Sequence, residues 1–160
     1  MFKVTRTTKP ESLNAAKSYA FKLLSRRSYS KAELKKRLFE KGFDLNVCLG
    51  TLQAMEEYGY INDPELAARE MERYLKERYL GPRRIEQRLR QRGIDVEIVN
   101  QVMGSVDTDL VQRLCLQEAR RKLGTLSHIE PQKKLARLGN YLLRRGYDLE
   151  SVNCCLRELF

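Results

Sequence analysis

The feature that most constrains the fold of this chain is a five-residue pattern that occurs three times. Each copy consists of a basic residue, a glycine, an apolar or aromatic residue, an aspartate and an aliphatic residue. The copies lie at 41–45, 92–96 and 145–149. They are about fifty residues apart, a longer period than that of the common two-helix repeats. The 160 residues of the chain are therefore expected to form three copies of one structural unit.

Apolar residues recur at fixed distances from each glycine. An aliphatic residue stands eight and four positions before it, and an apolar residue stands six and ten positions after it. The residues before the glycines are Leu34, Leu38, Ile85, Leu89, Leu138 and Leu142, and those after them are Cys48, Leu52, Val99, Met103, Val152 and Leu156. These spacings place the apolar residues on one face of a helix on each side of the glycine. The pattern predicts two helices joined by a tight turn.

The turns themselves are predicted to be built on Gly42, Gly93 and Gly146. Glycine adopts the left-handed conformation that ends many helices without steric cost. In such a turn the residue after the glycine folds back onto the residue four positions before the glycine. Both of these residues are apolar or aromatic in all three copies. The Lys or Arg before each glycine lies at the negative end of its helix dipole. The aspartates predicted to cap the following helices are Asp44, Asp95 and Asp148.

Helical periodicity and capping residues together predict nine helices and no strand. The predicted helices span 12–27, 31–41, 45–57, 64–79, 82–92, 96–105, 108–123, 132–145 and 149–159. Ser30 with Glu33 forms a capping box, and Pro64 and Pro82 are typical of helix starts. The expected fold class is all-α. An N-terminal tail at 1–11 precedes three tandem three-helix repeats at 12–62, 63–106 and 107–160, which we expect to stack into a short curved array.

Positive charge follows the repeat. The chain has 31 Lys and Arg residues against 21 Asp and Glu residues, which gives a formal net charge of +10. No Lys or Arg occurs at 42–68, 93–112 or 146–156, so the charge concentrates in the first and second helices of each repeat. Such a charge repels itself in a compact chain, which favours a polyanion or an acidic protein surface as the partner. The alternative explanation is that the positive net charge serves only to keep the protein soluble.

The second helix of each repeat carries basic residues on the face opposite its apolar residues. These candidates for binding a nucleoprotein filament or DNA are Lys35, Lys36, Arg83, Arg84, Arg90, Lys133, Arg137 and Arg144. Stacked repeats would align them into a basic stripe. The alternative is three ordinary solvated helix faces, and the sequence leaves it open.

Residue patterns typical of enzymes are missing. His128 is the one histidine, so neither a His-ligated metal site nor a Ser-His relay can be built around a second imidazole. No glycine-rich phosphate-binding motif occurs. We expect no catalytic residue, metal or cofactor. The cysteines are expected to be reduced core thiols. They are Cys48, Cys115, Cys154 and Cys155. No leader or membrane-spanning pattern is evident, which predicts a cytoplasmic protein without membrane contact.

The second repeat has the most distinctive sequence. It reads Gly-Tyr-Ile-Asn-Asp-Pro-Glu-Leu-Ala at 59–67 and Gly-Pro-Arg-Arg-Ile at 81–85, followed by Leu89 and by Arg-Gly-Ile at 92–94. The first repeat carries Tyr-Ala at 19–20, Leu-Leu-Ser-Arg-Arg at 23–27 and Tyr-Ser at 29–30. With these residues the chain resembles the RecX family of recombination regulators over nearly its whole length, least strongly in the third repeat.

This resemblance implies a partner and an activity. Members of the RecX family are small cytoplasmic bacterial proteins that modulate the RecA recombinase. The resemblance implies a three-repeat helical fold that lies in the groove of a RecA filament on single- or double-stranded DNA. Bound there as a monomer, it would hinder filament growth and suppress ATPase, recombinase and coprotease activities.

Two other classes of function remain open from the residues. A helix-turn-helix DNA-binding regulator would use the tight glycine-aspartate joints, but its third helix should be basic in order to enter a major groove. The stretches that form the third helices here contain almost no Lys or Arg. A general helical-repeat adaptor is also compatible with the repeats, and it would bind without regard to DNA or salt.

Overall fold

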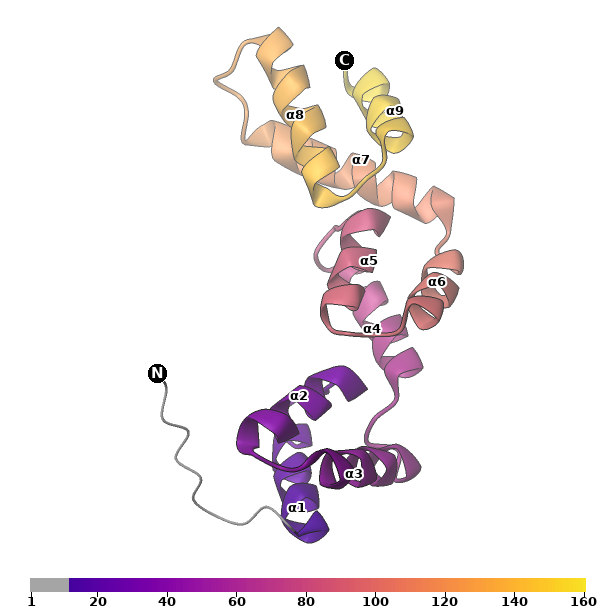
Figure 1. The fold of residues 1–160 in the computed structure, drawn as a ribbon. Coiled ribbons are helices and arrows are strands. Elements are labelled where there is room, and N and C mark those ends of the chain that lie inside the picture. The colour runs from indigo at the N-terminus through magenta and orange to yellow at the C-terminus, as the bar shows by residue number, and fades with distance from the viewer. Residues whose placement is uncertain (1–11) are drawn as a thin grey trace. The chain divides into compact units, whose positions relative to one another are not determined.

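The computed structural model describes residues 12–160, and the tail predicted at 1–11 lies outside the described residues. Within 12–160 the chain forms nine α-helices and no strand (Figure 1). The helices are α1 (Leu13–Leu24), α2 (Lys31–Lys41), α3 (Leu45–Glu57), α4 (Asp63–Lys76), α5 (Pro82–Gln91), α6 (Val96–Gly104), α7 (Thr108–Gly124), α8 (Pro131–Arg145) and α9 (Leu149–Leu159). The predicted all-α fold of three successive three-helix repeats is confirmed.

Two helices end three residues earlier than predicted. Helix α1 ends at Leu24, and the hydroxyl of Ser25, its C-cap residue, donates to the carbonyl of Lys22 at 3.0 Å. Helix α4 stops at Lys76, and shortly after it Tyr79 adopts a left-handed φ of +49°. Non-glycine residues rarely take this conformation. Periodicity alone does not reveal such an end.

The described residues form two compact units. The first consists of 12–66 together with Arg92–Ile94, and the second consists of 67–91 and 95–160. In the first unit α1 packs on α3, and α2 on both. In the second unit α5 packs on α6, and α7, α8 and α9 pack on one another. Figure 1 shows α8 and α9 crossing α7 at a steep angle.

Most of the apolar residues that the repeat predicted lie in the cores. In the first unit Leu34, Leu38, Cys48 and Leu52 are buried. Their counterparts in the second unit are Ile85, Leu89, Val99, Leu138, Leu142 and Val152, all buried. Met103 on α6 and Leu156 on α9 are only half-buried. The interior is closely packed wherever the repeat places an aliphatic side chain at these positions.

Cys154 does not belong to the core, which corrects one expectation. Cys48, Cys115 and Cys155 are buried free thiols, whereas Cys154 is exposed. Val152 and Cys155 face inward from α9, and helical geometry turns the residue between them toward solvent. The Cys115 thiol donates a hydrogen bond to Cys155, which raises the pKa of Cys115 above its ordinary value, and burial adds to this effect.

The three glycine turns have the predicted left-handed backbone. The φ values are +99° at Gly42, +73° at Gly93 and +95° at Gly146. At Gly42 the amides of Gly42 and Phe43 donate to the carbonyls of Phe39 and Leu38, which is the double hydrogen bond of a Schellman turn. Gly146 and Tyr147 repeat it with Leu143 and Leu142.

The aspartate caps are confirmed at two of the three turns. Asp95 accepts from the amide of Glu97 at 2.8 Å, and Asp148 accepts from the amide of Ser151 at 2.7 Å. Asp44 stands at the same position before α3, but its side chain makes no capping hydrogen bond. Without that hydrogen bond, the carboxylate can still favour α3 through the helix dipole.

Arg92 is held by the start of α2 in the first unit. Ser30 forms the predicted capping box with Glu33, and its hydroxyl also donates to the Arg92 carbonyl at 2.5 Å. The Arg92 guanidinium donates to both carboxylate oxygens of Glu33, at 2.8 and 3.2 Å, and to the carbonyl of Ser28 at 3.0 Å. Burial alone would raise the pKa of Glu33, but its contacts with Arg92, with the Ser30 amide and with Arg27 outweigh burial and lower it.

Helix α5 begins against the end of α8 in the second unit. The amide of Gly81 donates to the carbonyl of Arg145 at 2.9 Å, and the amide of Arg83 donates to the carbonyl of Gly146 at 3.1 Å. Amides at the start of a helix and carbonyls at the end of a helix both lack partners within their own helix. Here the amides at the start of α5 bond to the carbonyls at the end of α8. The positive end of one helix dipole therefore meets the negative end of the other.

Candidate functional site

All eight basic candidates lie on the second helices of the repeats. Helix α2 carries Lys35 and Lys36, helix α5 carries Arg83, Arg84 and Arg90, and helix α8 carries Lys133, Arg137 and Arg144. Six of them are exposed, whereas Lys35 and Arg84 are half-buried. The apolar faces of the same helices are buried, so the predicted division of each helix into an apolar and a basic face is confirmed.

In the first unit Lys36 has a weak acidic partner. Its ammonium group lies 4.0 Å from Glu40, one turn further along α2, and both side chains are well exposed. Arg37, which the sequence did not single out, takes the same carboxylate at 3.0 Å. Exposed pairs of this kind contribute little energy. The positive charge of α2 therefore remains available to a partner.

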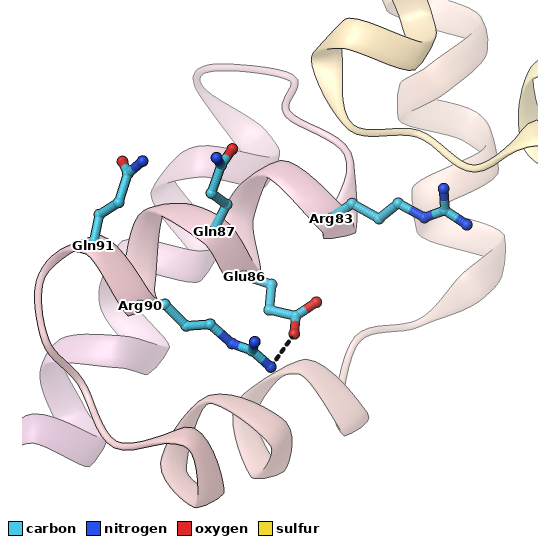
Figure 2. Close-up of a pocket in the computed structure, with 5 residues that line it drawn as sticks. All are labelled: Arg83, Glu86, Gln87, Arg90 and Gln91. Atoms are coloured by element: carbon cyan, nitrogen blue, oxygen red, sulfur yellow. Dashed lines mark ion pairs between the residues drawn. The ribbon is translucent and has the colours of Figure 1, made fainter.

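The charge on α5 is partly neutralised within the helix. Arg90 pairs with Glu86 at 2.6 Å, and the Arg84 guanidinium donates to Gln87 at 2.5 Å. Arg83, Glu86, Gln87, Arg90 and Gln91 line a shallow hollow on this helix. Figure 2 shows Gln87 and Gln91 pointing away from the Glu86–Arg90 pair. This face of α5 offers both donors and acceptors.

Arg84 also has a structural role that the sequence did not reveal. Gly146 lies directly against the main chain and β-carbon of Arg84, at the junction between α5 and α8. Arg83 and Arg144 are the exposed basic residues on the two helical turns that meet there. The structure thus brings candidates from the second and third repeats together, and it fixes Arg84 as part of that junction.

Arg145 is bound by groups from α7 and from the segment that follows α4. Its guanidinium donates to the carbonyls of Arg78 and Tyr79, the latter at 3.2 Å, and lies 3.4 Å from the buried carboxylate of Glu118. Arg121 also donates to Glu118, at 2.8 and 2.9 Å. Arg145 and Arg92 occupy the same position in their repeats, and each has a glutamate partner. These two basic residues therefore hold the fold together and are unavailable to a ligand.

The third helices are poor in positive charge, as predicted. Helices α3 and α6 contain no Lys or Arg, and α9 contains only Arg157, in its last turn. A helix that inserts into a DNA groove relies on basic residues for phosphate contacts. The arrangement favours binding through the second helices.

The part of the chain that the structure describes offers no metal site. Over residues 12–160, no cluster of three or more His, Cys, Asp or Glu side chains is placed to hold an ion. None of the described helices is long and apolar enough to cross a membrane. The candidate site is thus a set of basic helix faces.

Family models match each of the three repeats separately. The first three-helix domain of RecX matches residues 16–53, the second matches 65–103, and the third matches 110–156. The regulatory protein RecX of Amycolatopsis mediterranei is 32% identical over 137 residues, which cover 86% of this chain and 78% of that protein. The chain belongs to the RecX family. The regulatory protein RecX of Chlorobaculum tepidum is 28% identical, with 87% of this chain and 84% of the relative covered.

Solved RecX structures have the same fold. The crystal structure of RecX from Lactobacillus salivarius superposes with a TM-score of 0.83 at 18% identity, over 92% of this chain and 96% of that one. A second crystal structure of a regulatory protein RecX gives a TM-score of 0.79, also at 18% identity, over 88% and 70% of the two chains. The helical repeats of RecX are thus retained at low sequence identity, and the resemblance noted from the sequence is confirmed.

Proposed function

We propose that this chain is a non-enzymatic negative modulator of RecA. It binds the nucleoprotein filament that RecA forms on DNA, as a monomer in the cytoplasm. Bound there, it inhibits filament growth and the ATPase, recombinase and coprotease activities. The basic second helices make the contacts, and no metal or cofactor takes part.

One observation carries the proposal: three repeats of a RecX protein each present a basic second helix. A filament of RecA on DNA is a long polymer with many acidic groups and phosphates, and it can offer successive contacts to successive repeats. Exposed basic residues on all three second helices suit such a partner, because each contact adds to the others. The positive net charge also speeds encounter with a polyanion.

A helix-turn-helix regulator that acts alone on DNA is less consistent with the charges. Its third helix would face the groove, and α3 and α6 carry no basic residue. A general adaptor would not need basic second helices in all three repeats. Both alternatives predict binding that is independent of RecA, and this separates them from the proposal.

Co-sedimentation with RecA filaments on single-stranded DNA tests the proposal. We expect the protein to pellet with filaments and to lower DNA-dependent ATP hydrolysis by RecA, while hydrolysing no ATP alone. Naked DNA and free RecA serve as controls. Binding to naked DNA as tight as binding to filaments, with no effect on ATP hydrolysis, would favour the helix-turn-helix alternative. Loss of specific binding to filaments, with binding that is indifferent to both DNA and salt, would favour the adaptor.

A further inference from the structure

A basic hollow opens between α7 and α8 in the second unit. Its volume is about 420 Å³. The lining residues come from α7, from the loop after it and from α8, and they are Lys122, Leu126, Arg137, Asn140, Tyr141 and Arg144. Three of the six are cations and none is acidic. Lys122 lies on α7, the first helix of the third repeat, and is not one of the eight basic candidates on the second helices.

The three cations of this hollow have no acidic partner among the residues that the structure describes. No carboxylate of the described residues 12–160 lies within ion-pairing distance of Lys122, Arg137 or Arg144. The Lys122 ammonium instead lies 5.1 Å from the centre of the Tyr141 ring. A cation over an aromatic face is held in place without losing its charge.

The side chain of Tyr141 is held in place by a hydrogen bond to a buried carboxylate. Its hydroxyl donates to the buried carboxylate of Glu118, and burial raises the pKa of this tyrosine, followed by its bond to Glu118. Glu118 is 1% exposed and is occupied by Arg121 at 2.8 Å and by Arg145 at 3.4 Å. Glu118 is therefore already paired with two arginines outside the hollow, and it forms no ion pair with the three cations that line it.

The hollow on α5 provides an internal comparison. There Glu86 pairs with Arg90 at 2.6 Å (Figure 2), so an anion would have to displace a carboxylate already in place. The hollow between α7 and α8 presents only donors from its charged residues. Two guanidinium groups, an ammonium and the Asn140 amide can all donate to one ligand.

We propose that the hollow between α7 and α8 binds phosphate groups of a nucleic acid strand. A phosphate offers several acceptor oxygens to the two planar guanidinium forks and the ammonium group. A polynucleotide also brings successive negative charges at short intervals, which three converging cations require. Carboxylates gathered as closely on a protein surface would repel one another. The inference deepens the proposed function, on which it rests for the presence of DNA in the partner.

Fluorescence anisotropy with a labelled single-stranded poly-dT oligonucleotide tests this inference. The variant Arg137→Gln/Arg144→Gln removes two charges from the hollow, and Lys122→Gln removes the third. The matched control Arg113→Gln/Arg120→Gln removes two charges from exposed positions on α7, where Asp107 and Glu158 already pair with them. Circular dichroism melts establish that all variants are folded.

We expect the hollow variant to bind the oligonucleotide about tenfold more weakly and the control to stay within about twofold of wild type. The slope of log affinity against log salt should become shallower by roughly 1.4, which corresponds to two phosphate contacts on a single strand. Equal losses in the hollow variant and the control would overturn the inference, as would a wild-type protein that does not bind the oligonucleotide.

Two further measurements separate the outcomes. Poly-glutamate replaces the oligonucleotide as a probe, and equally tight binding of it, lost in the same variant, would make the hollow an acidic-peptide site and overturn the inference. The co-sedimentation experiment with RecA filaments reports on the proposed function. A wild-type protein that ignores filaments but binds the oligonucleotide through the hollow would overturn the proposed function and leave the hollow as a phosphate site.

Discussion

Gly81 lies against the main chain of Gly146, so close that a β-carbon on Gly81 would overlap the carbonyl group of Gly146. The two glycines belong to different repeats and meet where the start of α5 joins the end of α8. The hydrogen bond from the Gly81 amide to the Arg145 carbonyl, 2.9 Å long, holds this approach. Gly146 is needed for a left-handed turn and for the close approach of Arg84, whereas Gly81 is needed only because another backbone occupies the space of a side chain.

We therefore expect Gly81→Ala to destabilise the protein by about 2 kcal/mol or more, because the overlap is with backbone atoms that cannot rotate away. Gly104→Ala is the control, since a β-carbon at Gly104 meets nothing within 4 Å. Chemical denaturation followed by circular dichroism measures both. Equal stability of the two variants would contradict the close contact between Gly81 and the main chain of Gly146.

Gly93→Val and Gly42→Val should both be destabilising, but to different extents. The left-handed conformation costs a side-chain-bearing residue about 1–2 kcal/mol at either site. At Gly93 a β-carbon would also lie 2.5 Å from the β-carbon of Ala32, whereas at Gly42 it meets nothing within 4 Å. Thermal melts should show the larger loss for Gly93→Val. The reverse order would show that Ala32 does not pack on this turn.

Removing Glu118 should be more damaging than removing any exposed carboxylate. Glu118→Ala leaves the half-buried guanidinium of Arg145 without its acidic partner, and breaking a buried pair in this way costs about 3–5 kcal/mol. Glu158→Ala is the control, because the Glu158–Arg120 pair is exposed at 51% and 63%. Denaturation midpoints of the two variants provide the comparison, and similar values would argue against the role of Glu118.

The contact between Glu33 and Arg92 predicts a pH dependence. The pKa of Glu33 is lowered in the folded protein, so its ionised form adds stability above the pKa of the unfolded chain. That stability is lost as the pH falls through the folded pKa. Between about pH 5 and pH 3 the Glu33→Gln variant should therefore lose less stability than wild type. Parallel curves of unfolding free energy against pH would contradict this.

Arg83 is the better site for testing the basic faces by charge reversal, because Arg84 packs at the junction with Gly146. Arg83→Glu should leave the melting temperature nearly unchanged and weaken both filament binding and inhibition of RecA-dependent ATP hydrolysis. Lys76→Glu, on an exposed first-helix position, is the control. If the folded Arg83→Glu protein inhibits RecA with unchanged potency at every salt concentration, Arg83 is an ordinary solvent-exposed residue with no role in binding.

The repeat in the sequence was sufficient to predict most of the helices and the core. Leu34, Leu38 and their counterparts are buried as expected. The spacing of apolar residues along the chain sets which face of a helix is apolar, and that face packs into the core. The end of α4 could not be predicted, since Tyr79 takes a left-handed conformation in spite of its side chain. Its carbonyl is held there by Arg145 at 3.2 Å and by the hydroxyl of Tyr147 at 3.1 Å, both far along the chain.

The candidate site also has features that the sequence predicted and features that it could not predict. The sequence by itself determined which helices are basic, because the face of a helix follows from the spacing of its residues. Only the tertiary structure decided which cations are available. Arg92 and Arg145 are bound to Glu33 and Glu118, and Arg90 is paired with Glu86. Lys122 joins Arg137 and Arg144 in one hollow without a carboxylate partner among the described residues. Pairing depends on which side chains of distant segments meet, and no spacing along the chain specifies that.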